Sequence, residues 1–221
     1  MWFAAKSRYI DLPYHNFDHS LDTLWAVMKL ADKLEANGIA VNRKVLVGAA
    51  LLHDADFHKP LDGSGFETKE ARSAAIFADY AEGFGYTDDE IELGRQAILD
   101  TTLNRQPETP EGKILVRGDL DNIAGDYQTG LVQNTELLRQ ELEILSGEAV
   151  NFDDYAIVSL HVLAAYLSCD LSLGPVDDTY AEWEARAIDN LRTLASSVKD
   201  RSRLAEFAAL LGDSALGDNP D

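Results

Sequence analysis

The stretch VLVGAALLHD, residues 45–54, decides the fold that the sequence predicts. No polar residue interrupts positions 45–52, so a helix over this range is apolar on every side and is expected to be buried. Asn42, just upstream, is a residue type that caps helix N-termini. His53 and Asp54 end the helix, and an unpaired carboxylate beside a buried imidazole is costly. A divalent cation would offset that cost, because it accepts imidazole nitrogen and carboxylate oxygen together.

Helical patterns recur along the rest of the chain, whereas strand patterns are nearly absent. An apolar stripe at helical spacing over residues 21–34 predicts another helix. The segment TDDE at residues 87–90 is a capping box, and Thr109-Pro110 is typical of a helix start. One long helix is expected over residues 178–211. We therefore predict an all-α fold, a helical bundle with additional C-terminal helices.

Composition excludes several classes of function. With 221 residues, 46% of them apolar, the chain is long enough for one domain with a sizeable core. A formal net charge of -20 repels polyanions, so we expect no binding to polymeric nucleic acid, and any phosphate substrate should be small. Cys169 is the single cysteine, which excludes an intrachain disulfide. No apolar run approaches the ~20 residues of a membrane span, and we expect a cytoplasmic protein without membrane contact.

Four of the five histidines fall within the first 58 residues. His15 and His19 are four residues apart and would share one helix face if the helix includes both. A lone helical histidine is usually structural, and His161, which lies among apolar residues, is interpreted in that way. His58 lies in an irregular loop. The candidate metal ligands are therefore His19, His53 and Asp54, and they are candidates only as a set.

A fourth metal ligand is expected from another buried helix. Asp119 is a good candidate, because it lies among apolar residues and Gly118 beside it allows a second helix to approach closely. Asp121 and Asp126 are the alternatives, although Asp121 falls away from the apolar face of that helix. The sequence thus predicts one cation bound by two imidazoles and two carboxylates.

This set of residues resembles the HD superfamily of metal-dependent phosphohydrolases, which are all-helical. The segment YHNFDH at residues 14–19 resembles the YHNxxH signature of cyclic-nucleotide phosphodiesterases and of a group of uncharacterised bacterial HD phosphohydrolases. Four later segments are similar to that bacterial group, namely LLHDADF at 51–57, ETKEARSAA at 67–75, AILDTTL at 97–103 and RGDLDN at 117–122. The resemblance covers the chain from about Tyr14 to Asn122.

The resemblance implies a ligand set for Mn, Fe, Zn or Mg, consisting of His19, His53, Asp54 and Asp119. It also implies that His15 is the general acid of a phosphohydrolase. Two departures leave open whether one or two ions bind: His58 follows the HD pair by four residues where the phosphodiesterases have three, and Asn104 and Arg105 follow the Thr-ending helix where the bacterial group tends to have a histidine.

The mechanism that we expect assigns the remaining candidate residues. Asp54 would hold the attacking water or bridge to a second, loosely held cation. Glu70 would orient the water, the alternative being a solvated helix residue. Charge that develops on phosphorus needs cations, and Arg8 and Arg72 are the favoured candidates. The other cationic residues near the motifs are Lys59, Lys69 and Arg117. Asn122 would contact a substrate base or cap a neighbouring segment.

We therefore predict a metal-dependent phosphohydrolase that cleaves a phosphoester or phosphoanhydride bond of a nucleotide-like small molecule. The alternatives are a catalytically silent HD module that binds a nucleotide or a partner protein, a plain helical scaffold, and an HD-type oxygenase. We expect residues 1–130 to form the metal-binding core, residues 131–212 to pack on it as C-terminal helices, and residues 213–221 to form a frayed acidic tail. An apolar stripe from Trp183 to Leu194 leaves a homodimer open.

Overall fold

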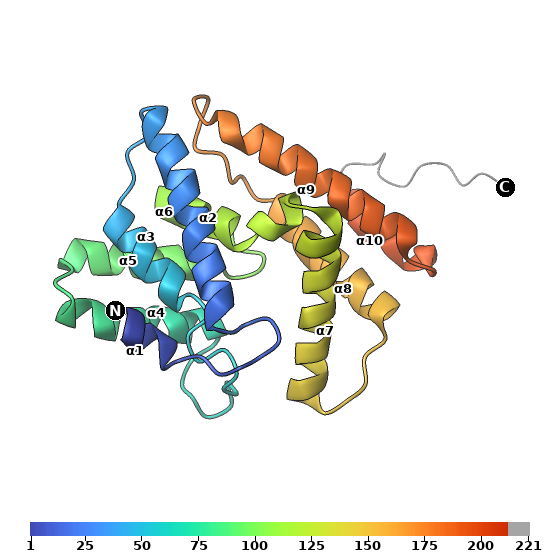
Figure 1. Ribbon diagram of the computed structural model, residues 1–221, viewed down its shortest axis with the longest axis horizontal. Helices are drawn as coiled ribbons and strands as arrows, with labels where there is room; N and C mark the ends of the chain where they lie inside the picture. Colours follow the sequence, from blue (N-terminus) through green and yellow to red (C-terminus); the bar gives the residue numbers. More distant parts are fainter. Residues whose placement is uncertain (212–221) are drawn as a thin grey trace. The chain divides into compact units, whose positions relative to one another are not determined.

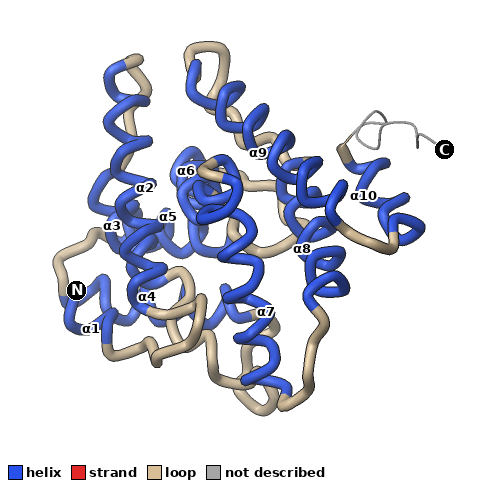
Figure 2. Tube along the Cα trace, turned by 45° about the vertical axis from the view of Figure 1, so that its right-hand side comes forward, coloured by secondary structure: helices blue, strands red, loops and turns tan. Residues whose placement is uncertain are grey.

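The computed structural model describes residues 1–211, and all regular elements within that range are helices (Figure 1). Figure 2 shows only helices and loops along the described trace, which confirms the all-α fold class. The predicted acidic tail at residues 213–221 lies outside this range. Within the described residues, no helix is both long enough and apolar enough to span a bilayer.

The chain divides into two compact units. The first consists of Met1–Asp121 together with Leu171–Thr179, and the second consists of Asn122–Asp170 together with the described residues from Tyr180 onward. The helices of the first unit are α1 (Trp2–Lys6), α2 (Phe17–Ala36), α3 (Arg43–Leu52), α4 (Lys69–Gly83), α5 (Asp88–Leu99) and α6 (Pro110–Asp119). The predicted boundaries, with a core over residues 1–130 and C-terminal helices over residues 131–212, do not coincide with these two units. They stay a prediction.

Irregular turns accompany the longer helices of the second unit. A 3₁₀ turn (Asp121–Ala124) and a π-helical turn (Tyr127–Val132) lead into α7 (Gln133–Ser146). The remaining elements are α8 (Phe152–Leu167), α9 (Asp178–Ser197), a 3₁₀ turn (Arg201–Leu204) and α10 (Ala205–Leu210). Within this unit, α8 packs against both α7 and α10.

Helix α3 is the central element of the first unit, as its apolar sequence predicts. It contacts α2, α4, α5 and α6, and most of its side chains are fully buried. Its N-terminus is capped as expected, because the side chain of Asn42 accepts a hydrogen bond from the backbone N–H of Val45 at 3.2 Å. The predicted capping box at Thr87 and the predicted start at Thr109 are also present. Local capping signals therefore set the helix starts around the core.

The prediction of one helix over residues 178–211 is wrong. Helix α9 ends at Ser197, and the chain resumes in a 3₁₀ turn before α10. The cause is Asp200, whose side chain accepts a hydrogen bond from the backbone N–H of Ser202 at 3.2 Å and so starts a new turn. In the predicted dimer stripe, Trp183, Leu191 and Leu194 are buried. The homodimer stays a prediction.

A buried ion pair anchors the segment Leu171–Thr179 within the first unit. The guanidinium of Arg117, on α6, donates to the carboxylate of Asp177 at 2.6 Å and to the hydroxyl of Thr179 at 2.6 Å. Both side chains of the ion pair are almost inaccessible to solvent. Because a buried charge needs a partner, Arg117 serves to hold this segment against α6.

Helices α2 and α6 approach each other closely at Gly118. A Cβ atom added there would lie 2.3 Å from Cγ2 of Val27 on α2, which is too short for any real contact. Valine is stiff about χ1, so the clash could be relieved only by moving a helix. The expectation that Gly118 allows close helix approach is thereby confirmed, and the contact lies one residue before Asp119.

We expect Gly118→Ala to lower the free energy of unfolding by about 1–3 kcal/mol, because the added methyl group overpacks the α2–α6 contact. Gly83→Ala is the matched control, since a Cβ atom at the end of α4 meets no atom within 4 Å. Urea unfolding of both variants and the wild type measures the difference. Equal stability of Gly118→Ala and Gly83→Ala would show that the close approach of α2 and α6 does not require glycine at position 118.

Candidate metal centre

Three segments of the first unit bring four candidate ligands together. His19 lies in the first turn of α2, His53 caps the C-terminus of α3 with Asp54 directly after it, and Asp119 is the last residue of α6. Each side chain offers one ligand atom, and these atoms all lie within 4.8 Å of one another. This group could hold a metal ion, as the sequence predicts. The alternative ligand Asp121 is exposed and lies outside the group.

The distances within the cluster fit a bound cation. His19 Nε2 lies 3.0 Å from Asp119 Oδ1 and 3.5 Å from Asp54 Oδ2. His53 Nε2 lies 3.0 Å from Asp54 Oδ2 and 3.3 Å from Asp119 Oδ1. Ligand atoms that bind one ion at about 2.0–2.2 Å are roughly 3.0–3.5 Å apart in tetrahedral or octahedral geometry. All four nitrogen–oxygen distances therefore match the edges of one coordination polyhedron.

The two imidazoles also present free ligand atoms. Nε2 of His19 and Nε2 of His53 are buried and have no hydrogen-bond partner of acceptable geometry. The other nitrogen of His53, Nδ1, lies 2.9 Å from the backbone carbonyl oxygen of Ala50. Donation from Nδ1 to this carbonyl leaves the lone pair on Nε2, which is the usual way a protein orients a metal-binding histidine. Each Nε2 faces carboxylate oxygens at 3.0–3.5 Å without a well-formed hydrogen bond, and a cation between them would give both nitrogens a partner.

In the metal-free cluster, histidine charge and carboxylate charge support each other. Burial acts to lower the pKa of His19, but contact with Asp119 and Asp54 outweighs it and raises the pKa to about 9. Burial likewise opposes ionisation of Asp54, but the charges of His53 and His15 outweigh it and hold the pKa of that carboxyl well below its usual range. The same carboxylates raise the pKa of His53 well above its usual value, and the two histidines hold the pKa of Asp119 below its usual range. Both carboxylates are therefore ionised at neutral pH, and an incoming cation displaces protons from His19 and His53.

The cluster lies at the edge of the core rather than inside it. The side chain of His53 is 1% exposed, whereas that of Asp119 is 23% exposed. Helices α3 and α6 both end at the cluster, and helix C-termini carry partial negative charge that favours a cation. Solvent thus reaches the carboxylate side of the site. The two helix C-termini add a negative electrostatic potential there, which attracts a cation.

His15 lies beside the cluster but outside the helix. Helix α2 begins at Phe17, so the condition on which His15 and His19 would share a helix face, that the helix includes both, is not met. The backbone bend at residues 13–16 nevertheless places Nε2 of His15 4.0 Å from Asp54 Oδ2. The ring of His15 stacks on the ring of Phe57, with centroids 3.6 Å apart and 15° between the planes.

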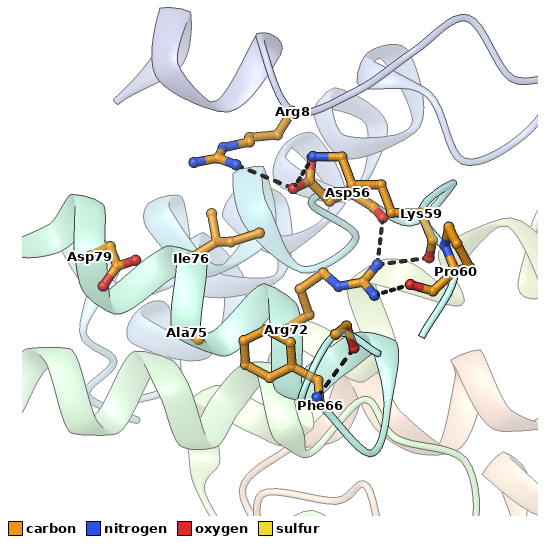
Figure 3. A pocket seen from close by; sticks show the side chains of 10 residues that line it. Arg8, Asp56, Lys59, Pro60, Phe66, Arg72, Ala75, Ile76 and Asp79 are labelled. Atoms are coloured by element: carbon orange, nitrogen blue, oxygen red, sulfur yellow. Dashed lines mark hydrogen bonds and ion pairs between the residues drawn. The ribbon is translucent and has the colours of Figure 1, made fainter. Parts of the chain in front are cut away.

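The predicted substrate residues Arg8 and Arg72 line a cavity of about 510 Å³ that the loop after α3 borders (Figure 3). Arg72 is buried and donates to the backbone carbonyl oxygens of Asp56, Lys59 and Pro60, at 3.2, 2.7 and 2.6 Å. It therefore clamps this loop. Arg8 donates to the carboxylate of Asp56 at 3.2 Å, and its side chain is 34% exposed. Contact of either arginine with a substrate stays a prediction.

The other predicted site residues have different places in the chain. Glu70 lies in the first turn of α4, and no hydrogen bond or ion pair of the described residues joins it to the cluster. Asn122 belongs to the second unit and lies in the 3₁₀ turn Asp121–Ala124. Their roles in orienting water and binding substrate stay predictions.

Two features of the loop after α3 were not found from the sequence. Asp56 has a positive φ of 60°, which few residues other than glycine adopt, and its carboxylate also accepts from Lys59 at 2.7 Å. Phe57 contacts His15 on one side and Lys69 on the other, with the Lys69 ammonium 3.3 Å from the ring centroid. The presence of an aromatic residue shortly after the HD pair was the signal that could have pointed to Phe57. The conformation of Asp56 leaves no sequence signal of its own.

The chain was compared with models of known protein families and with curated proteins, and neither comparison finds a match. The case for a metal site therefore depends on the geometry of the cluster alone. It establishes a group of side chains that could hold a metal ion, and the HD resemblance stays a prediction.

We expect Asp119→Ala to weaken Mn²⁺ or Zn²⁺ binding by about 100-fold or more, because loss of a direct ligand should exceed the 10–100-fold effect of an outer-shell residue. Asp121→Ala, two residues along the chain and exposed, is the matched control and should bind like the wild type. Isothermal titration calorimetry of the metal-free proteins measures both. Equal affinities for the two variants would rule out Asp119 as a ligand.

Proposed function

We propose that this protein is a metal-dependent phosphohydrolase of the HD type that cleaves a phosphoester or phosphoanhydride bond in a nucleotide-like small molecule. The observation that carries the proposal is the cluster of two imidazoles and two carboxylates, whose ligand atoms lie within 4.8 Å of one another at a partly exposed edge of the core. The sequence motifs around the same residues supply the reaction class. The surplus of negative charge favours a small substrate over a polymer.

The four cluster residues would hold the cation, whose identity among Mn, Fe, Zn and Mg the ligand set leaves open. When bound, such a cation lowers the pKa of a coordinated water and neutralises charge on a phosphoryl oxygen. Asp54 is at the centre of the cluster, since its Oδ2 is within 4.0 Å of His15, His19 and His53. It is therefore the carboxylate best placed to orient an attacking water.

His15 has the position that a proton donor needs. It is next to the ligand set without belonging to it, and its side chain is 17% exposed. A group in that position can reach a leaving oxygen while the cluster residues bind the phosphoryl group. Positive charge is also near at hand, because the ammonium of Lys69 lies over the Phe57 ring on which His15 stacks. Such a cation helps to attract a phosphorylated ligand to an acidic protein.

The test is turnover of bis-p-nitrophenyl phosphate and of a nucleotide panel with added Mn²⁺, compared among wild type, Asp54→Ala, His15→Gln and the exposed-site control Asp121→Ala. We expect metal-dependent turnover by the wild type and the control, and none by Asp54→Ala. His15→Gln should bind metal normally and lose about 10²- to 10⁴-fold in kcat on nucleotide substrates, whose leaving oxygens need a proton, with a smaller loss on bis-p-nitrophenyl phosphate.

No turnover by the wild type, or equal rates for the wild type and Asp54→Ala, would contradict the proposal. A wild-type protein that binds one metal ion per chain and turns over nothing would instead favour the silent module that binds a nucleotide or a partner.

A further inference from the structure

Phe57 lies between two side chains of opposite character. The ring of His15 is stacked on it at a centroid distance of 3.6 Å, and the ammonium of Lys69 is 3.3 Å from the same centroid. A stacked ring at this distance covers one face of the phenyl group completely. The ammonium must therefore lie over the opposite face, and the three side chains form a sandwich with Phe57 in the middle.

Each layer of this sandwich comes from a different segment. His15 lies in the bend before α2, Phe57 lies in the loop after α3, and Lys69 is the first residue of α4. The ammonium is attracted to the negative face of the ring, an interaction worth about 0.5–2 kcal/mol. One face of the Phe57 ring thus contacts Lys69 of α4, and the other face contacts His15.

The orientation of His15 needs such support. Its backbone is outside the helix, so no helical turn restricts its side chain. The χ2 torsion of histidine is broad and roughly twofold, so neighbouring side chains must choose the ring orientation. Tyr14 and His19 meet the His15 ring only edge-on, at 80° and 86° between the planes. Phe57 is the neighbour that lies parallel to it, at 15°.

We propose that Phe57 is a positioning residue, which holds the His15 ring so that Nε2 stays beside Asp54 and can protonate the leaving oxygen. This inference rests on the proposed function and adds a residue to which no role has been given. The proton moves from His15 Nε2 to the leaving oxygen as the phosphorus–oxygen bond breaks, while water supplies the new oxygen on phosphorus. Phe57 is not one of the candidate ligands, and the role that we propose for it acts through His15 alone.

Phe57→Leu removes the flat face but keeps an apolar side chain, and Phe57→Tyr keeps the face. Phe84→Leu is the matched control, because Phe84 is an exposed phenylalanine at the C-terminal cap of α4 and belongs neither to the ligand cluster nor to the lining of the cavity in Figure 3. Metal titration and circular dichroism first establish that all three variants fold and bind Mn²⁺ like the wild type. If Phe57→Leu fails to fold, Phe57→Tyr and Phe57→Met take its place in the comparison.

Two substrates of similar shape separate a positioning role from a structural one. Diphenyl phosphate expels phenol, a weaker acid than the p-nitrophenol expelled from bis-p-nitrophenyl phosphate, so its leaving oxygen depends more on protonation. We expect Phe57→Leu to lower kcat on diphenyl phosphate about 10- to 100-fold, with a much smaller loss on bis-p-nitrophenyl phosphate and little change in KM. Phe57→Tyr should restore the rate on diphenyl phosphate, and Phe84→Leu should match the wild type on both substrates.

A second readout does not depend on activity. In the histidine side-chain NMR spectrum of the metal-free protein, the Phe57 ring current should shift the His15 ring protons upfield. Phe57→Leu should abolish that shift, and Phe84→Leu should keep it. Equal losses on both substrates, or an unchanged His15 resonance in Phe57→Leu, would overturn the inference and leave the proposed function standing. Absence of turnover by the wild type would overturn both together.

Discussion

The structure of the first unit depends on two buried imidazole nitrogens that face two carboxylate oxygens. Nε2 of His19 and of His53 are closed off from water and lack hydrogen-bond partners, although carboxylate oxygens lie 3.0–3.5 Å away. Such an arrangement is expensive for a protein to build without a ligand, because buried polar atoms are normally satisfied. A cation at the centre gives each of the four groups a partner at once. The electrostatics agree, since the carboxyls are held ionised by their histidine neighbours.

The helices around the cluster are arranged to keep these four side chains in place. Residues 48–52 of helix α3 are all buried, so His53 and Asp54 directly after them are fixed at the edge of the core with little freedom. Gly118 lets α6 approach α2, which brings Asp119 to His19. Arg72 clamps the loop that follows Asp54 by binding three of its carbonyls. Close packing and buried polar contacts thus convert three distant segments into one site.

The parts of this arrangement that the sequence predicts are those with a local signal. Helix starts at Asn42, Thr87 and Thr109 follow from capping residues, and the burial of α3 follows from its unbroken apolar run. The ligands could be predicted because an HD pair at the end of a buried helix, and an aspartate in an apolar helix, are both unusual. The distances between these ligands could not be predicted from the sequence, because they depend on how α2, α3 and α6 pack.

The predictions that failed, or that stay open, concern partners rather than residue types. A positive charge near a motif suggests a phosphate ligand. The sequence around Arg72 does not reveal that its guanidinium donates hydrogen bonds to carbonyl oxygens of the loop after α3. The apolar spacing beyond Ser197 continues to look helical, and only the side-chain cap at Asp200 divides it. The left-handed conformation of Asp56 and the stacking of Phe57 arise from tertiary contacts, which one sequence does not display.

The most direct test of the central claim is a crystal structure of the protein grown with Mn²⁺, with an anomalous difference map collected at the manganese absorption edge. We predict one peak inside the first unit, bound by Nε2 of His19 and His53 and by carboxylate oxygens of Asp54 and Asp119 at about 2.0–2.3 Å. A map with no peak between these four side chains, or with the side chains pointing apart, would contradict the account.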